Sequence, residues 1–118
     1  MTGLFVYSCS VSPRDARIGE LGQDDIGAFV RIRGHVRSVT TVGSGGVRVD
    51  MLDYADYSSI SAYLSAKVFH SLDYSANIKP GAFLELAGEV EVFNGRVEVS
   101  VQKGESVKLL ARVDDNII

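Results

Sequence analysis

Apolar and polar residues alternate along most of the chain, and this alternation predicts five β-strands. In the first, Val30, Ile32 and Val36 are separated by polar residues, a period of two that is typical of a strand with one buried face. Four later segments repeat the pattern. Their inward positions are Val47, Val49 and Met51, then Ile60, Ala62 and Leu64, then Leu84, Leu86, Val90 and Val92, and finally Val97, Val99 and Val101. The pattern therefore predicts an all-β domain.

The period changes once, between the third and fourth strands. Within residues 65–77, Val68, Phe69 and Leu72 lie at helical spacing, which predicts one short amphipathic helix. Pro80 and Gly81 then form a turn signal. Residues 94–95 are an Asn-Gly pair between the fourth and fifth strands, which is typical of a tight hairpin. We also expect residues 107–110 to form a closing segment.

Two segments of the chain echo one another. Residues 27–36 read GAFVRIRGHV and residues 81–90 read GAFLELAGEV, so both follow the pattern GAF-apolar-x-apolar-x-Gly-x-Val. A glycine inside a strand indicates a bulge or a sharp bend. Gly34 and Gly88 occupy the same place in the two copies, so we expect both strands to bend at equivalent points. A small sheet closes into a barrel by such coiling.

This order of elements, the glycine-containing first and fourth strands and the Pro-Gly before the fourth resemble the OB-fold nucleic-acid-binding domains of the tRNA-anticodon, helicase and replication protein A type. The resemblance covers about residues 18–113. It implies a five-stranded Greek-key barrel with one short helix between strands three and four. It also implies a ligand groove on strands two and three, bordered by the loops that join strands one to two and four to five.

The residues outside 18–113 are assigned separately. Residues 1–17 contain the apolar run 3–7 (GLFVY), which is too short to span a bilayer and lacks the basic flank of a signal peptide. Residues 1–17 are therefore either an arm, tucked in or added as an edge strand, or the stub of a longer apolar anchor. We expect a cytoplasmic location, or a membrane-anchored one if the run is such a stub. Cys9 is expected to be an inert thiol, and residues 114–118 a tail.

Composition narrows the class of function. The chain has 118 residues, 46% of them hydrophobic and 23% charged, and a net charge of −3. These values fit one folded domain and argue against a disordered tail or a strongly basic coat protein, while a local basic face remains compatible. Signatures such as GxGxxG, the Walker A loop and HExxH are missing from the sequence. Asp50, Asp53 and Asp56 are too few for a calcium loop, and two histidines are too few for zinc. We expect no enzymatic activity, metal or cofactor.

Basic and aromatic residues gather around the first three strands and the last hairpin. The candidates for nucleic-acid contact are Arg33, Arg37, Arg48, Tyr54, Tyr57, Tyr63, Phe93 and Arg96. OB folds hold single strands by stacking bases on aromatic rings and by aligning arginines with phosphates. We therefore expect a module that binds single-stranded nucleic acid with little sequence preference, DNA rather than RNA. Other domains or subunits of a replication, repair or tRNA-handling complex are possible further partners.

The alternative is a protein-interaction or structural OB module without a nucleic-acid ligand. Glutamates project from the fourth strand at positions 85, 89 and 91. Ion pairs between these glutamates and Arg31 or Arg37 would make the charges ordinary surface pairing. Arg33, Arg48 and Arg96 have no obvious acidic partner in the sequence, so we expect them to be the better candidates for ligand contact.

Overall fold

The computed structural model describes residues 12–113. The apolar run at residues 3–7, Cys9 and the tail lie outside the described residues, so the alternatives for them stay open. Within residues 12–113, each helix is too short or too polar to cross a membrane.

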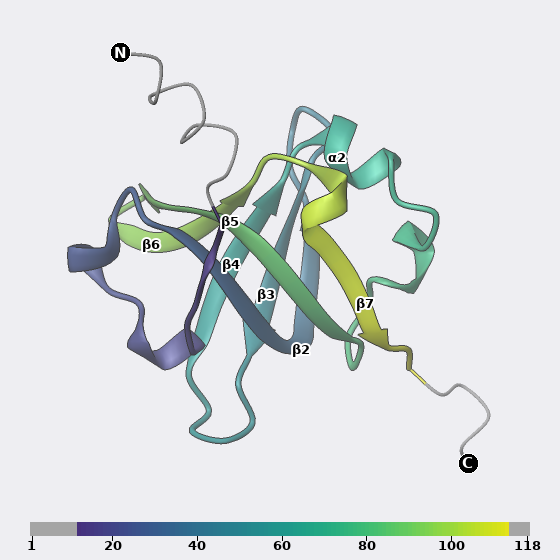
Figure 1. Ribbon diagram of the computed structural model, residues 1–118. Coiled ribbons are helices and arrows are strands. Elements are labelled where there is room, and N and C mark those ends of the chain that lie inside the picture. The colour runs from purple at the N-terminus through teal and green to yellow at the C-terminus, as the bar shows by residue number, and fades with distance from the viewer. Residues whose placement is uncertain (1–11, 114–118) are drawn as a thin grey trace.

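Five strands form a closed barrel (Figure 1). An antiparallel meander of β2 (Phe29–Thr41), β3 (Val47–Leu52) and β4 (Ser59–Leu64) comes first. β5 (Phe83–Phe93) then returns to pair antiparallel with β2. β6 (Arg96–Val101) pairs antiparallel with β5 and parallel with β4, which closes the ring. The predicted Greek-key barrel is confirmed.

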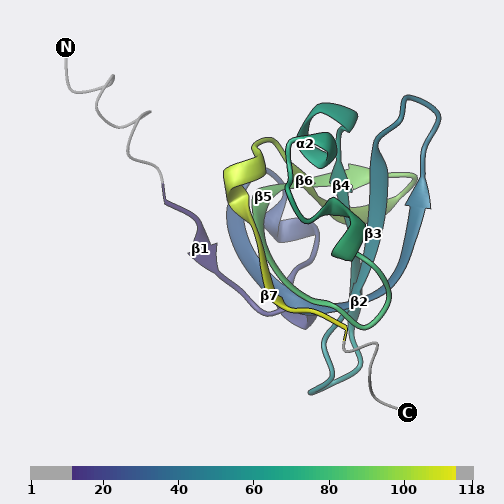
Figure 2. The same cartoon turned by 90° about the vertical axis from the view of Figure 1, so that its right-hand side faces the viewer.

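Shorter elements complete the domain. β1 (Arg14–Asp15) pairs in parallel with β2, and β7 (Val107–Ala111) pairs antiparallel with β5. The helix α2 (Ala66–His70) lies over one end of the barrel (Figure 2). The remaining elements are short 3-10 turns, namely η1 (Ile18–Glu20), η2 (Gln23–Asp25), η3 (Ser75–Asn77) and η4 (Gly104–Ser106). The helix predicted over residues 65–77 is therefore confirmed in its first part only, and β7 is the expected closing segment.

The inward positions of the five strands form one core. Ile32, Val49, Leu64, Leu86 and Val99, one from each barrel strand, have no exposed surface. Burying an aliphatic side chain of this size contributes about 1.5–3 kcal/mol. The alternation in the sequence thus decides which face of each strand points inward, and it leaves the outer face to polar and aromatic residues.

The two echoed glycines sit where their strands change partners. β2 pairs with β5 up to His35 and with β3 from His35 onward, whereas β5 passes from β2 to β6 at Glu89. Gly34 and Gly88 each immediately precede such a point. A Cβ atom on Gly88 would lie 2.3 Å from the carbonyl oxygen of Ser100, so this close approach requires glycine. The two glycines therefore lie at equivalent points of their strands, as predicted. Of the two alternatives for Gly34, a bulge or a sharp bend, the bulge is excluded, because the irregularity of β2 falls between Val36 and Ser38.

Candidate nucleic-acid interface

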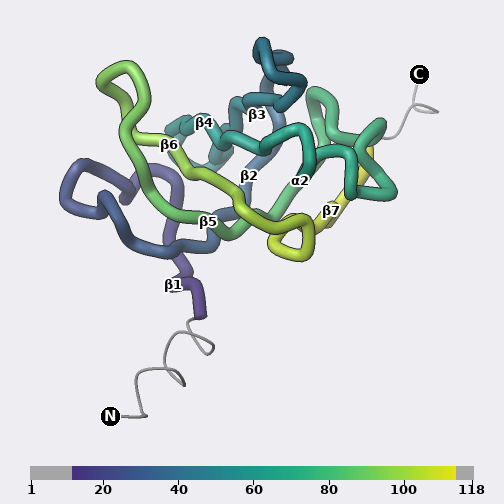
Figure 3. The backbone as a smooth tube through the Cα atoms, turned by 90° about the horizontal axis from the view of Figure 1, so that it is seen from above, coloured from purple at the N-terminus to yellow at the C-terminus, as the bar shows by residue number. Residues whose placement is uncertain are grey.

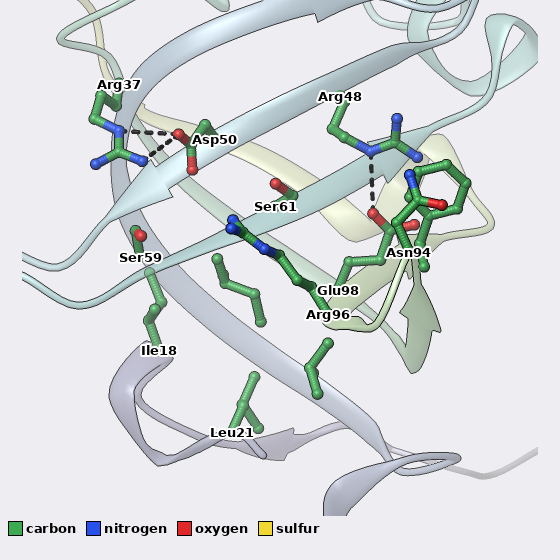
Figure 4. A pocket seen from close by; sticks show the side chains of 13 residues that line it. Ile18, Leu21, Arg37, Arg48, Asp50, Ser59, Ser61, Asn94, Arg96 and Glu98 are labelled. Atoms are coloured by element: carbon green, nitrogen blue, oxygen red, sulfur yellow. Dashed lines mark hydrogen bonds and ion pairs between the residues drawn. The ribbon is translucent and has the colours of Figure 1, made fainter. Parts of the chain in front are cut away.

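The outer face of β3, β4 and β6 carries a groove of about 560 Å³ (Figure 4). We call it the β3–β4–β6 groove. Figures 1 and 3 show that the β5–β6 hairpin and the segment of η1 and η2 lie on the same side of the barrel, and both contribute to its walls. Its charged residues are Arg37, Arg48, Arg96, Asp50 and Glu98, and the end near η1 is apolar.

Strand register brings the polar residues of this groove together. Asp50 on β3 lies opposite Ser61 on β4, and Ser61 lies beside Glu98 on β6. Residues that are paired across neighbouring strands project from the same face of the sheet. Arg37 lies at the irregularity of β2 itself, between Val36 and Ser38, and its guanidinium Nε donates to Asp50 Oδ2 at 2.9 Å.

Arg48 links a buried carboxylate to an aromatic ring. Its Nε donates to Glu98 Oε2 at 3.1 Å, and its guanidinium carbon lies 4.1 Å from the centre of the Phe93 ring. The Tyr63 ring centre lies 5.6 Å from the same carbon. The Glu98 side chain is only 9% exposed and that of Arg48 is 24% exposed. Contacts of this kind hold a guanidinium in one place, so Arg48 fixes the Phe93 ring.

Arg96 differs from the other two arginines of the groove. It extends from the β5–β6 hairpin across β4 toward Ser61 (Figure 4). Arg37 and Arg48 are paired with Asp50 and Glu98, whereas Arg96 forms no ion pair with any of residues 12–113. Among the three arginines of the groove, Arg96 is therefore the one whose charge no carboxylate of residues 12–113 neutralises.

A smaller hollow of about 460 Å³ adjoins the groove and shares Arg48, Phe93 and Glu98 with it. Tyr63 and residues 42–44 of the β2–β3 loop line its other side. The two loops that border the ligand groove of an OB fold therefore both reach this face.

Comparisons with solved structures identify this architecture. Asparaginyl-tRNA synthetase from Entamoeba histolytica matches 91% of this chain with a TM-score of 0.72 and 12% sequence identity. The enzyme from Pyrococcus horikoshii matches 88% with a TM-score of 0.70 and 17% identity. The chain is an OB-fold domain. It spans only 26% and 24% of those two synthetase chains.

An OBody bound to hen egg-white lysozyme also matches this OB-fold domain. The TM-score is 0.68 and the identity 23%, over 87% of this chain and 100% of that chain. No protein-family model matches the sequence, and no curated protein matches it. The likeness to solved structures confirms the OB-fold resemblance that the sequence suggested.

The OB-fold domain brings five of the eight predicted contact residues to this face. Arg37, Arg48, Phe93 and Arg96 line the groove, and Tyr63 lines the adjoining hollow. The other three lie elsewhere. Arg33 and Tyr54 line a separate cleft beside β2. Tyr57 lies at the exposed tip of the β3–β4 turn, with a φ of 60°.

Two expectations about ion pairs are wrong. Arg33 and Arg48 do have acidic partners, because Arg33 Nε donates to Glu85 Oε1 at 2.8 Å and Arg48 pairs with Glu98. The antiparallel register of β2 and β5 causes the first pair, since it places Arg33 opposite Glu85.

The partners expected for Arg31 and Arg37 are also corrected. Arg31 lies opposite Ala87 on β5 and donates to Asp15 of β1 at 2.9 Å, and Arg37 donates to Asp50 of β3. Neither arginine is paired with a glutamate of β5. The pairing of β2 with β5 ends at His35, so Arg37 lies beside β3 and not beside β5.

Sequence reasoning missed several polar residues of the groove. Ser59 and Ser61 occupy outward positions of β4, and Asn94 lies in the hairpin turn. Both serines alternate with the buried residues of β4, so the sequence pattern already placed them on the outer face of the strand. The partner strand that brings Arg96 beside them could not be read from the sequence.

The acidic residues of the β3–β4 turn order the turn itself. The Ser58 hydroxyl donates to Asp56 Oδ1 at 2.6 Å, and the Ser58 backbone N–H donates to the same oxygen at 3.0 Å. These hydrogen bonds, the side-chain one first, lower the pKa of the Asp56 carboxyl. Within residues 12–113, His, Cys, Asp and Glu side chains form no group of three that would hold a metal ion.

Proposed function

We propose that the β3–β4–β6 groove binds single-stranded nucleic acid without catalysing a reaction. The observation that supports this most strongly is the arrangement of Phe93 and Arg96. Arg48 lies over the Phe93 ring, yet the residue remains 46% exposed, so part of it stays accessible to a base. The unpaired Arg96 guanidinium lies in the same groove.

The residues of the groove take different roles in this proposal. Phe93 and Tyr63 stack on bases, a contact worth about 1–3 kcal/mol per base. Arg96 contacts a phosphate. Arg48 acts as a positioning residue, because its guanidinium is held by Glu98 and Phe93. Stacking and phosphate contact accept every base, so we expect little sequence preference.

The preference for DNA over RNA stays part of the proposal, and the two synthetase structures are the reason to measure RNA beside it. We further propose that the domain works in the cytoplasm as one part of a larger replication, repair or tRNA-handling assembly. In the synthetases a region of this fold makes up about a quarter of a longer chain, which supports such an arrangement.

The salt dependence of binding tests the role of Arg96. Labelled oligo(dT) and oligo(rU) of about 12 nucleotides, within the span that one OB fold covers, are titrated by fluorescence anisotropy at several salt concentrations. For a single strand, the slope of log K against log salt is about −0.7 per neutralised phosphate. Arg96→Ala should weaken binding and flatten the slope by about 0.7.

Arg112→Ala is the matched control for this titration. Arg112 is exposed and directly follows β7, and the end of β7 lies away from the β5–β6 hairpin in Figure 1. The substitution should leave both affinity and slope unchanged. An Arg96→Ala variant whose slope equals that of the wild type would remove Arg96 from the phosphate contacts.

A protein partner is the second candidate. Asp50 and Glu98 neutralise Arg37 and Arg48, and the OBody that shares this fold is bound to a protein, lysozyme. Binding of an oligonucleotide at low salt distinguishes the two candidates. If neither oligonucleotide binds at low salt, the protein-partner candidate becomes the better account of the groove.

A further inference from the structure

Three aromatic rings are stacked beside the groove, on the outer face of β2 and its neighbours. The rings of Tyr54 and His35 are parallel within 2°, with centroids 4.0 Å apart, and the rings of His35 and Phe83 are 4.6 Å apart. We propose that Tyr54 is a second stacking platform, which takes a base of the same single strand that occupies the β3–β4–β6 groove. This inference rests on the proposed function and adds a second site to it.

The strand order explains how the three rings come together. Phe83 is on β5 and His35 on β2, where the two residues are directly paired. Tyr54 follows β3 in the turn, and β2 lies between β5 and β3. His35 is therefore packed between the other two rings. Phe83 forms the half-buried end of the stack and Tyr54 forms its exposed end.

The outer side of Tyr54 is open and lies near two exposed arginines, each of them paired with a carboxylate. Tyr54 is 55% exposed although His35 covers one face of its ring. It lines a cleft of about 330 Å³ together with Arg17 and Arg33. Each guanidinium is paired with a carboxylate, Arg17 with Asp53 at 3.3 Å and Arg33 with Glu85 at 2.8 Å. Both side chains remain more than half exposed, so both are accessible to a phosphate.

The platform and the groove lie on one continuous sheet face. His35 on β2 is paired with Leu52 on β3, and Leu52 is paired with Ser59 on β4. Ser59 and Arg96 line the groove together. Three strand spacings thus separate His35 from the hairpin side of the groove, about 14 Å in all. A single strand that crosses the sheet in this direction passes from Phe93 and Arg96 to Tyr54.

A nucleobase fits this site better than an aliphatic side chain does. The rings of Tyr54 and His35 are parallel within 2°, whereas those of His35 and Phe83 are inclined by 27°, and a further planar ring on Tyr54 continues the parallel end of the stack. Arg17 and Arg33 are paired with carboxylates, but each guanidinium remains more than half exposed and can donate further hydrogen bonds to a phosphate next to the base. A base attached to its phosphate has both features.

The experiment measures affinity against oligonucleotide length. Oligo(dT) of about 3 to 12 nucleotides is titrated into the wild type, Tyr54→Ala and Tyr54→Phe. Short oligomers should bind all three proteins equally. Longer oligomers should gain affinity with the wild type, and Tyr54→Ala should lose about 5-fold or more of that gain. Tyr54→Phe should keep it, because stacking needs the ring and not the hydroxyl.

Tyr57→Ala is the matched control. Tyr57 is in the same turn, is more exposed than Tyr54 and lines neither the groove nor the cleft, so its removal should change no affinity. Thermal unfolding of each variant checks that the fold is intact. A length-dependent gain that survives in Tyr54→Ala overturns the second platform and leaves the proposed function in place. An equal loss at every length also overturns it. Absence of binding at every length overturns both proposals.

Discussion

Replacing Arg48 with methionine tests how firmly the aromatic groove is held together. The substitution keeps an unbranched side chain but removes the partner of Glu98, whose side chain is only 9% exposed. Removing one member of a buried ion pair costs about 3–5 kcal/mol. Arg48 is itself 24% exposed, so solvent screens part of the interaction, and the loss of the Phe93 contact adds a smaller amount. We expect Arg48→Met to lower the free energy of unfolding by about 2–3 kcal/mol.

Arg37→Met is the matched control for this prediction. The Arg37 side chain is 53% exposed and its partner Asp50 is 26% exposed, so both members of this pair are more open to solvent than Arg48 and Glu98. An exposed pair of this kind contributes about 0–1 kcal/mol. The double variant Arg48→Met with Glu98→Gln should recover much of the stability that Arg48→Met loses, because no buried charge then remains without a partner.

Urea unfolding followed by far-ultraviolet circular dichroism measures five proteins: the wild type, Arg48→Met, Glu98→Gln, the double variant and the control Arg37→Met. The chain has no tryptophan, which makes the backbone signal the simpler probe. The double-mutant cycle isolates the coupling between the two side chains. Equal losses in Arg48→Met and Arg37→Met would refute the reasoning. A double variant no more stable than Arg48→Met would refute it as well.

Two further predictions concern the barrel itself. Gly88→Ala should cost about 3 kcal/mol in urea unfolding, because the new Cβ would meet the Ser100 carbonyl oxygen; Gly43→Ala, where a Cβ meets no atom within 4 Å, should be nearly neutral, and equal midpoints would contradict the close approach. Burial raises the pKa of the Tyr74 phenol above 10.0, and its hydroxyl donates to the Val107 carbonyl. The folded state therefore holds this proton more tightly, so its contribution to stability is present below pH 10.0 and is lost as pH rises through the folded-state pKa. Tyr74→Phe should lack this alkaline loss, and a Tyr74→Phe stability curve parallel to that of the wild type above pH 10.0 would contradict it.

The sequence allowed most of the barrel to be predicted, because each strand alternates cleanly between buried and outward residues. The Asn94-Gly95 pair marks the β5–β6 hairpin, in which both residues have positive φ, the conformation that such a turn requires. The echoed glycines marked the two points where a strand changes partner. Each of these signals depends on residues that are close together in the sequence, so it can be recognised without knowing which strands pair.

The partners of the charged side chains could not be predicted in the same way. They depend on register between strands that are far apart in sequence, such as Arg33 opposite Glu85 and Arg48 near Glu98. The change of partner strand in β2 after His35 places Arg37 beside β3, where it contacts Asp50. The same register separates Tyr54 from the groove and places it over His35, a stack that the sequence did not suggest.

An NMR titration tests the central claim, that the β3–β4–β6 groove binds single-stranded nucleic acid. Amide resonances are followed while oligo(dT) or oligo(rU) is added at low salt. We predict that shifts concentrate at Ser61, Phe93 and Arg96, and that the amide of Glu89, whose exposed carboxylate repels phosphate, stays unchanged. Absence of any shift at about millimolar oligonucleotide, an affinity weaker than about −4 kcal/mol, would contradict the claim. Shifts confined to the outer face of β5 around Glu89 would contradict it equally.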